Sequence, residues 1–321
     1  MGNESGINSC IASPAISVIV AAFNAESSIS RCIESIVSQS FTDYELLIIN
    51  DGSTDKTPDI IEEYRTRYPQ IRSVHQQNQG IALTRQKGID MAAGQYSIFV
   101  DADDWIEPDM LEGMYSKIVE SKADIVICDF YEEFNNRKEY RRQDPGSSDH
   151  LVIQRKMLNE LHASLWNKLI RHQLYKQYDI GFISDVNCFE DQLVMIRLLS
   201  HPVEVAYVGK AYYHYDKSMN TGSITNLWHR PIKERMLLLN SIEPYMQSAE
   251  HQNAFDYYAA KRVFDAAFAG KDEETDYKQL YSRYKTRLFR SPLSWKHKLL
   301  CILRYAGFGR IIRLYSRIAG I

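Results

Sequence analysis

Residues 16–57 read ISVIVAAFNAESSISRCIESIVSQSFTDYELLIINDGSTDKT, and this stretch decides the fold. It holds two short apolar runs rich in β-branched residues, Ile16–Ala21 and Tyr44–Asn50, which predict strands. Between them, the apolar residues of Ser28–Ser38 recur at helical spacing. Both runs are almost continuously apolar, as in strands that are covered on both faces of a parallel sheet. The stretch therefore predicts two parallel strands joined by a crossover helix.

The same alternation of strands and helices continues to residue 130, with predicted strands at Ile71–His75, Tyr96–Val100 and Ile125–Phe130 and helices at Pro58–Tyr68 and Ile81–Ala93. We predict an α/β fold in which helices flank a doubly wound, mostly parallel sheet. Further along, we predict helices at Leu151–Leu161 and Asp191–Leu199 and strands at Val203–Val208 and Ala211–Tyr215.

The segments between these elements are polar. The charge-rich stretch Tyr131–His150 predicts an exposed excursion, and Asp216–Asn226 predicts a loop. Beyond Pro231 the pattern is helical throughout. The chain is thus expected to end in a helical C-terminal extension.

Charge is unevenly distributed along the 321 residues, although the formal net charge is only −3. Eleven of the 38 Lys/Arg and none of the 41 Asp/Glu lie from Tyr277 onward, so residues 1–276 carry a net charge of −14. The acidic body gives no reason to expect a nucleic-acid partner. The basic tail, whose apolar and basic residues interleave, predicts an amphipathic helix for an anionic membrane surface or for docking on the acidic body.

The five cysteines are odd in number and scattered, which favours a reducing compartment. The first residues do not resemble a signal peptide, and no apolar run reaches the eighteen or so residues that a spanning helix needs. We therefore expect a cytoplasmic protein that is peripheral on the inner face of the membrane.

Three acidic side chains follow the fourth predicted strand, in the sequence Asp101-Ala102-Asp103-Asp104. In open α/β sheets, ligands bind beyond the carboxyl ends of the strands. Carboxylates so close together repel one another unless a cation lies between them, and oxygen ligands suit Mg²⁺ or Mn²⁺. The sequence has neither a G-x-G-x-x-G motif after a strand nor a P-loop, so we expect a metal to hold the phosphates.

The chain resembles the family 2 inverting glycosyltransferases with a GT-A fold, particularly those of bacterial surface-polysaccharide synthesis. The resemblance lies in residues 17–57, in NQGIALTRQKGIDMAAGQYSIFVDADDWIEPDML (78–111), in LWNKLIRHQL (165–174) and in Phe189–Asp191. It implies transfer of a sugar, with inversion, from a nucleotide diphosphate donor such as a UDP-sugar. The acceptor would be a hydroxyl of a glycan or lipid-linked glycan, and Mn²⁺ or Mg²⁺ would assist.

The resemblance also implies a division of the chain. Residues 1–14 would be a flexible N-terminus and 15–228 the catalytic domain, with a nucleotide-sugar half to about 130 and an acceptor half from 131. Residues 229–321 would form the helical region, including the basic tail 277–321. Formation of a homo-oligomer is left open.

The resemblance implies roles for individual residues of this sequence. Asp191 would be the general base, and Asp103 the most direct metal ligand, with Asp101 beside it and His214 completing the shell. The nucleotide-sugar site would consist of Phe23, Asn24, Glu26, Asn50, Asp51, Arg85, Asp101 and Asp104. The acceptor side would include Trp166, Asn167, Lys168 and Glu190.

Each of these roles has a structural alternative. The acidic turn could be a solvated loop, and Asp51 beside Gly52 could form an ordinary turn. Glu190 and Asp191 could only stabilise the first turn of a helix. Residues 219–225 could be a lid or simply a loop. For the whole chain, the alternatives are a sugar-phosphate nucleotidyltransferase and an inactive subunit that binds sugar nucleotides.

Overall fold

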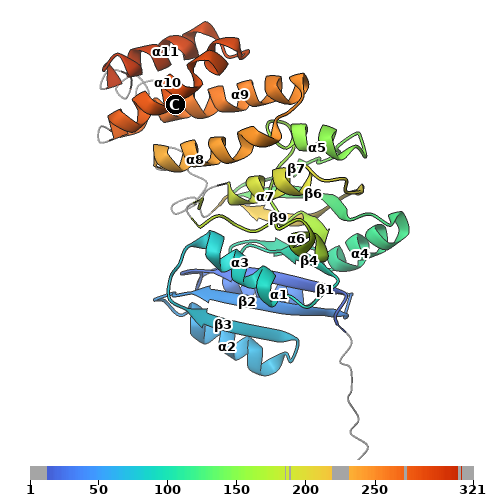
Figure 1. Ribbon diagram of the computed structural model, residues 1–321. Coiled ribbons are helices and arrows are strands. Elements are labelled where there is room, and N and C mark those ends of the chain that lie inside the picture. Colours follow the sequence, from blue (N-terminus) through green and yellow to red (C-terminus); the bar gives the residue numbers. More distant parts are fainter. Residues whose placement is uncertain are drawn as a thin grey trace, which may run out of the picture.

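The computed structural model describes residues 13–184, 186–187, 189–218, 231–270, 273–309 and 312. The predictions made for residues 1–12, for most of the 216–226 loop and for the end of the basic tail lie outside these described residues. The fold has a sheet with flanking helices in its N-terminal part and a stack of helices in its C-terminal part (Figure 1).

The alternation predicted for the first hundred residues is confirmed. Each element matches its predicted range to within about two residues, in the order β1 Ile16–Ala22, α1 Ile29–Val37, β2 Tyr44–Asp51, α2 Thr57–Arg67, β3 Ile71–Gln76, α3 Ile81–Met91 and β4 Tyr96–Phe99. All eight residues of β2 are buried, as expected for a strand covered on both faces. Strand β1 pairs in parallel with β2 on one side and with β4 on the other.

The sheet runs in the order β3-β2-β1-β4-β8-β6-β9-β5, with β7 paired to β6 outside this path. Strands β1 to β4 form three parallel pairs at one end of the sheet. Strand β8, Lys168–Arg171, is antiparallel to both of its neighbours, β4 and β6. The chain runs outward from β1 through β2 to β3 and then returns to β4 on the other side of β1, so the strand order reverses between β1 and β4. The polar loops after β1, β2 and β4 therefore meet at one edge of the sheet. The predicted α/β fold with a mostly parallel sheet is thus confirmed.

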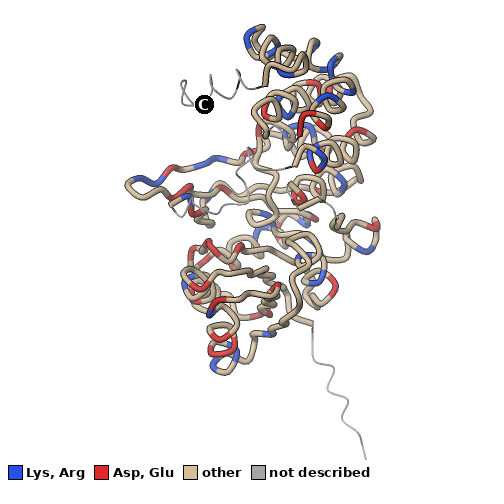
Figure 2. Tube along the Cα trace, turned by 90° about the vertical axis from the view of Figure 1, so that its left-hand side faces the viewer, with Lys and Arg blue, Asp and Glu red and all other residues tan. Residues whose placement is uncertain are grey.

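The second half of the sheet differs from the prediction in three places besides the unpredicted strand β8. The stretch expected to be an excursion is the hairpin of β6, Ile125–Phe134, and β7, Arg137–Arg141, which protrudes from the body (Figure 2). The two strands expected near residue 208 are one continuous strand, β9, Val205–Asp216. Strand β5, Trp105–Ile106, follows the acidic turn and pairs with β9.

Helices complete this half of the molecule, and their bounds are α4 Met110–Ser121, α5 His150–Lys156, α6 Gln173–Gln177 and α7 Glu190–Leu198. Helix α5 is shorter than predicted, because the chain leaves the helix after Lys156 and turns through residues 157–161. Helix α7 begins at Glu190, as the sequence indicated to within one residue.

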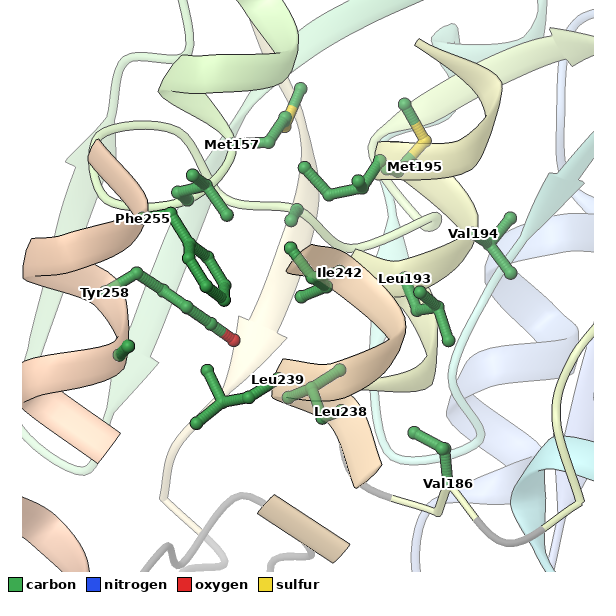
Figure 3. Close-up of a cluster of buried hydrophobic side chains, with 14 of the residues drawn as sticks. Met157, Val186, Leu193, Val194, Met195, Leu238, Leu239, Ile242, Phe255 and Tyr258 are labelled. Atoms are coloured by element: carbon green, nitrogen blue, oxygen red, sulfur yellow. The ribbon is translucent and has the colours of Figure 1, made fainter. Parts of the chain in front are cut away.

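The C-terminal part is helical, as predicted, with α8 Ile232–Ile242, the 3₁₀ helix η2 Glu243–Tyr245, α9 Ala249–Ala266, α10 Glu274–Arg290 and α11 Trp295–Tyr305. These helices share a hydrophobic core with α7. Leu193 of α7, Leu239 of α8 and Phe255 of α9 belong to this one cluster (Figure 3). The Tyr258 hydroxyl of α9 donates to Gln192 of α7 at 2.5 Å. No described helix is long and apolar enough to cross a membrane.

Candidate active site

The loops after β1 and β2 bind each other at the edge of the sheet. The amide of Asn24 donates to Ser53 Oγ at 2.9 Å, and the side-chain oxygen of Asn24 accepts from the amide of Thr54 at 2.9 Å. In the same way, the amide of Glu26 donates to Asp55 Oδ2 at 3.0 Å. Asn24 has a φ of 48°, a conformation that asparagine tolerates better than most residues. The two loops therefore form one rigid rim.

Asn50 and Asp51, at the end of β2, are buried and fully engaged. Asp51 accepts from the amides of Gln79 and Gly80, each at 2.9 Å, so its carboxylate holds the chain just before α3. The amide of Asn50 lies 3.0 Å from Nδ1 of His75 on β3. Both side chains are placed at the rim where the sequence predicted a nucleoside pocket. Their role in binding a base stays a prediction.

Arg85 of α3 joins three acidic side chains that lie far apart in the sequence. Its Nη2 donates to Asp101 at 2.6 Å, and its Nη1 donates to Glu190 at 2.5 Å and also contacts Asp191. The other oxygen of Asp191 accepts from the amide of Leu165 at 3.0 Å. Arg85 is buried, with its side chain 6% exposed. One cation thus connects the acidic turn after β4 to the first turn of α7.

Burial dominates the electrostatics of this cluster. It raises the pKa of Glu190 to about 7 against the opposing effect of Arg85. Burial also raises the pKa of Asp191, while Arg85 and the Leu165 amide favour its ionised form. The three carboxylates in turn raise the pKa of Arg85, so the guanidinium remains charged. Perturbed carboxyl groups that share one arginine are typical of functional sites, although structural networks also produce them.

The three aspartates of the acidic turn have different surroundings. Asp104 is completely buried and accepts from the Tyr213 hydroxyl at 2.7 Å and from the Asp216 amide at 2.8 Å. Asp101 is partly exposed and bound to Arg85. Asp103 is exposed. Its carboxylate is nevertheless partly shielded from water by the protein around it. This shielding, together with the negative charges of Asp101 and Asp216, raises the pKa of Asp103 to about 6. Asp103 is therefore the member of the turn that is open to a ligand, whereas Asp104 holds β9 in place.

The residues fit a divalent cation that is shared with a substrate. Among the described residues, no three His, Cys, Asp or Glu side chains are grouped as a protein cage for a metal. Mg²⁺ and Mn²⁺ do not need such a cage, since they are commonly bound by one or two carboxylates together with water and substrate phosphates. Asp103 supplies one such carboxylate, and Asp101 lies two residues away with one oxygen engaged by Arg85.

Sequence reasoning missed Arg31, which closes one side of the acidic turn. Its Nη2 donates to the backbone oxygen of Asp103 and to Asp216 Oδ2, both at 2.6 Å. Its guanidinium carbon lies 3.9 Å from the centre of the Trp105 ring. In the sequence Arg31 is one basic residue on a helix, and Asp216 is 185 residues away. No local pattern indicates this contact.

His214 lies on β9, behind the acidic turn. Its Nδ1 is 2.8 Å from Glu133, and its Nε2 is 2.9 Å from Glu107. The ring stacks between Trp105 and Tyr131, with ring centres 4.9 and 5.1 Å away. Both ring nitrogens are thus engaged by carboxylates, whereas a metal ligand needs one nitrogen free. A role of His214 in the metal shell would require one ring nitrogen to give up its carboxylate partner, and this role stays a prediction.

The predicted acceptor-side segment is buried. Trp166 stacks on Tyr213 at 4.2 Å between ring centres. Lys168 is fully buried, and its ammonium donates to the backbone oxygens of His162 and Ser164 at 2.9 and 2.6 Å and to Asn167 Oδ1 at 2.6 Å. These contacts fix the turn whose Leu165 amide reaches Asp191. Trp166, Asn167 and Lys168 are thus arranged as supports for the site. Whether they also contact an acceptor stays a prediction.

Phe23, at the end of β1, is the one predicted nucleoside residue with a largely exposed ring, at 52%. An exposed aromatic face beside the rim is available for stacking on a planar base.

The chain matches the family model described as "Glycosyl transferase family 2" over residues 17–179. It is 33% identical over 234 residues to EpsH of Bacillus subtilis, covering 70% of this chain and 67% of EpsH. The chain belongs to glycosyltransferase family 2. Glycosyltransferase GlyA of Streptococcus pneumoniae is 31% identical over 227 residues, and the match spans 66% of this chain but only 32% of GlyA.

Solved structures share the fold. S. aureus TarS, residues 1–349 with UDP-GlcNAc, has a TM-score of 0.69 at 21% identity, covering 95% of this chain and 92% of that one. The mannosyltransferase PcManGT from Pyrobaculum calidifontis, in complex with GDP-Man and Mn²⁺, has a TM-score of 0.54 at 16% identity, covering 94% of this chain and 88% of that one. At such identities, the likeness establishes the GT-A fold.

Proposed function

We propose that the chain transfers a hexose, with inversion, from a UDP-sugar to a hydroxyl of a glycan or lipid-linked glycan, assisted by Mn²⁺ or Mg²⁺. The observation that carries the proposal is the Arg85 cluster, which connects Asp101 of the acidic turn to Asp191 at the start of α7. A transferase of this kind needs charge neutralisation at the diphosphate and a base at the acceptor, and the cluster places both kinds of group together.

The donor end of the site would be the rim formed by the loops after β1 and β2. In this assignment Phe23 stacks on the base, while Asn24, Glu26, Asn50 and Asp51 shape the nucleoside pocket. The complexes of TarS with UDP and with UDP-GlcNAc support a uridine nucleotide. PcManGT with GDP-Man is the reason to test guanosine donors as well.

The diphosphate would lie at Asp101 and Asp103. Asp103 and Asp101 would hold a divalent cation there, which would supply neutralisation of the charge on the leaving diphosphate. PcManGT and GalNAc-T7 were both solved with Mn²⁺, which supports a metal in this chain. Arg31 holds the backbone oxygen of Asp103, which fixes the turn that presents this carboxylate.

Asp191 would remove the proton from the acceptor hydroxyl. Its carboxylate accepts from Arg85 and from the Leu165 amide, and each oxygen keeps a further lone pair for the acceptor proton. The acceptor oxygen then forms a bond to the anomeric carbon as the bond to the diphosphate breaks. The electron pair leaves on the nucleoside diphosphate, and the configuration at carbon inverts. Asp191 ends the step protonated.

The reaction would take place in the cytoplasm. The three described cysteines, Cys32, Cys128 and Cys301, are buried free thiols, as expected in a reducing compartment.

Two alternative functions are less consistent with the site than sugar transfer is. A nucleotidyltransferase is disfavoured, since such an enzyme needs donors for a triphosphate, and the rim at residues 22–28 contains no glycine and no basic residue. An inactive binding subunit would have no need for a buried carboxylate pair beside Arg85.

A thermal-shift screen of nucleotide sugars, with and without Mn²⁺, tests donor binding. A ligand present at a hundred times its dissociation constant adds about 2.7 kcal/mol to stability. We expect a rise in melting temperature with UDP-sugars and Mn²⁺ and a smaller rise with EDTA. A screen in which no nucleotide sugar raises the melting temperature, with or without metal, would contradict the proposal.

A further inference from the structure

Helix α11 is apolar on two opposite faces. Its inner face buries Cys301 completely and packs Leu300 against the core of the helical region. On the opposite face, Trp295, Leu299 and Ile302 are 68%, 41% and 37% exposed. Their spacing of four and three residues places them in one row along the helix. A helix that only needs to cover a core requires one apolar face, so the outer row needs a separate explanation.

Further large apolar side chains of α10, α11 and the turn after α11 are also exposed. Tyr305 at the end of α11 and Phe308 just after it are 41% and 49% exposed, and Phe289 at the end of α10 is 52% exposed. Helix α11 lies at the outer end of the helical stack, away from the sheet (Figure 1). Contiguous exposed aromatic and aliphatic side chains mark an interaction surface.

The charge around this surface is mainly positive, although Glu274 of α10 lies beside Gly307 just after the end of α11. From Tyr277 to the end, the sequence has eleven Lys/Arg and no Asp/Glu. Lys285, Arg290 and Lys296 are exposed on α10 and α11. The rest of the chain has the opposite balance, at −14. Whatever covers the outer row therefore meets a surface on which exposed basic groups outnumber acidic ones.

We propose that the outer face of α11 seats in the surface of an anionic lipid bilayer, with the helix lying in the plane of the interface. Trp295, Leu299 and Ile302 enter the boundary between headgroups and acyl chains, and the flanking lysines and arginines meet anionic headgroups. The inner face remains docked on the helical region, so the whole protein is carried to the membrane. The proposal is independent of the donor and the acceptor.

Charge favours lipid over a second copy of the chain. A symmetric dimer through this face would bring the same basic residues together across its two-fold axis. Like charges facing each other at an interface are unfavourable. An anionic bilayer is apolar beneath and negative at its surface, and both features match.

Vesicle flotation tests the proposal on the full chain. We expect the protein to float with vesicles of phosphatidylglycerol and phosphatidylcholine, to remain unbound with phosphatidylcholine alone, and to be released by salt. The triple variant Trp295→Ser, Leu299→Ser, Ile302→Ser should lower the partition coefficient at least about tenfold. A matched control, Val119→Ser with Leu151→Ser, removes two exposed apolar side chains elsewhere and should bind as the wild type does.

Tryptophan fluorescence provides a second measurement that needs no disruptive variant. Emission of the intact protein should shift to the blue and be quenched by brominated anionic lipid, and Trp295→Phe should remove this change while flotation persists. Unchanged flotation of the triple variant, or binding that ignores lipid charge, would overturn the proposal. So would self-association without lipid that the triple variant abolishes, since the face would then join two copies.

Discussion

The guanidinium of Arg85 contacts the carboxylate of Asp191, although the two residues are 106 positions apart in the sequence. The same guanidinium bonds Asp101 at 2.6 Å through its other nitrogen. The predicted base and the first aspartate of the acidic turn therefore share one cation. A change at Arg85 should affect both.

Replacing Arg85 with methionine should destabilise the protein strongly. Three buried or partly buried acidic side chains would lose their common partner, and breaking a buried ion pair costs about 3–5 kcal/mol. Arg65→Met is the matched control, because Arg65 pairs with Glu62 on the surface, where such a pair is worth about 1 kcal/mol or less. Urea unfolding of both variants measures the two losses of stability. Equal losses of stability would show that the Arg85 cluster is not a buried network.

Replacement of aspartate by asparagine should have different effects at the neighbouring positions Asp103 and Asp104: the first should lose metal-dependent binding and the second should lose stability. Asp103→Asn should abolish Mn²⁺-dependent binding of the donor and leave stability almost unchanged, because Asp103 is exposed. Asp104→Asn should destabilise by about 1–3 kcal/mol, because the Tyr213 hydroxyl and the Asp216 amide donate to different oxygens of Asp104 and asparagine replaces one of them with an NH2 donor. Calorimetric titration and thermal unfolding measure the two effects. Undiminished Mn²⁺-dependent binding in Asp103→Asn would remove that residue from the metal site.

Asp191 should matter for chemistry more than for binding. Asp191→Asn is expected to lower kcat by about 10²–10⁴-fold, with donor affinity unchanged, because a general base acts only in the chemical step. Glu190→Gln is the control, since Glu190 also bonds Arg85 but is more buried. It should lower kcat less. If the Gln variant loses more activity than the Asn variant, the base is Glu190.

Lys168 should make stability depend on pH. Burial lowers the pKa of Lys168 to about 7, whereas in the unfolded chain a lysine keeps its proton to about pH 10. Between these values the unfolded state binds more protons, so this lysine's contribution to stability rises with pH by at most roughly 1.4 kcal/mol per unit. The difference in unfolding free energy between wild type and Lys168→Met should therefore grow from pH 7 to pH 9. A difference that stays constant would mean that the folded protein keeps the ammonium charged.

Much of the fold follows from local sequence patterns. The first strands are apolar and bounded by turn residues, so their positions could be predicted. The position of strand β8 could not be predicted, because Lys168–Arg171 is only four residues long and begins with a lysine. The burial of this lysine depends on hydrogen bonds from its ammonium to the preceding turn, which the sequence does not reveal. The first part of β6 was predicted as the strand Ile125–Phe130, but β7 was missed because it is exposed, charged along its length and without an apolar face.

The site was predictable where it depends on strand ends. Asn24, Asp51 and Asp101 lie at the carboxyl ends of β1, β2 and β4, and the topology of the sheet brings these ends together. Arg31 and its contact with Asp216 depend on how the end of β9 packs against α1. Such a contact has no period or spacing in the sequence, so tertiary structure was needed to find it.

The most direct test of the proposed reaction is phosphorus NMR of the protein incubated with Mn²⁺ and the UDP-sugar that stabilises it best, with water or a glycan as acceptor. We expect the phosphorus spectra to show that UDP accumulates and that EDTA stops its formation. Proton spectra recorded early in the reaction should show that the released or transferred sugar has the anomeric configuration opposite to that of the donor. Formation of pyrophosphate, or a product that retains the donor configuration, would contradict the proposed reaction.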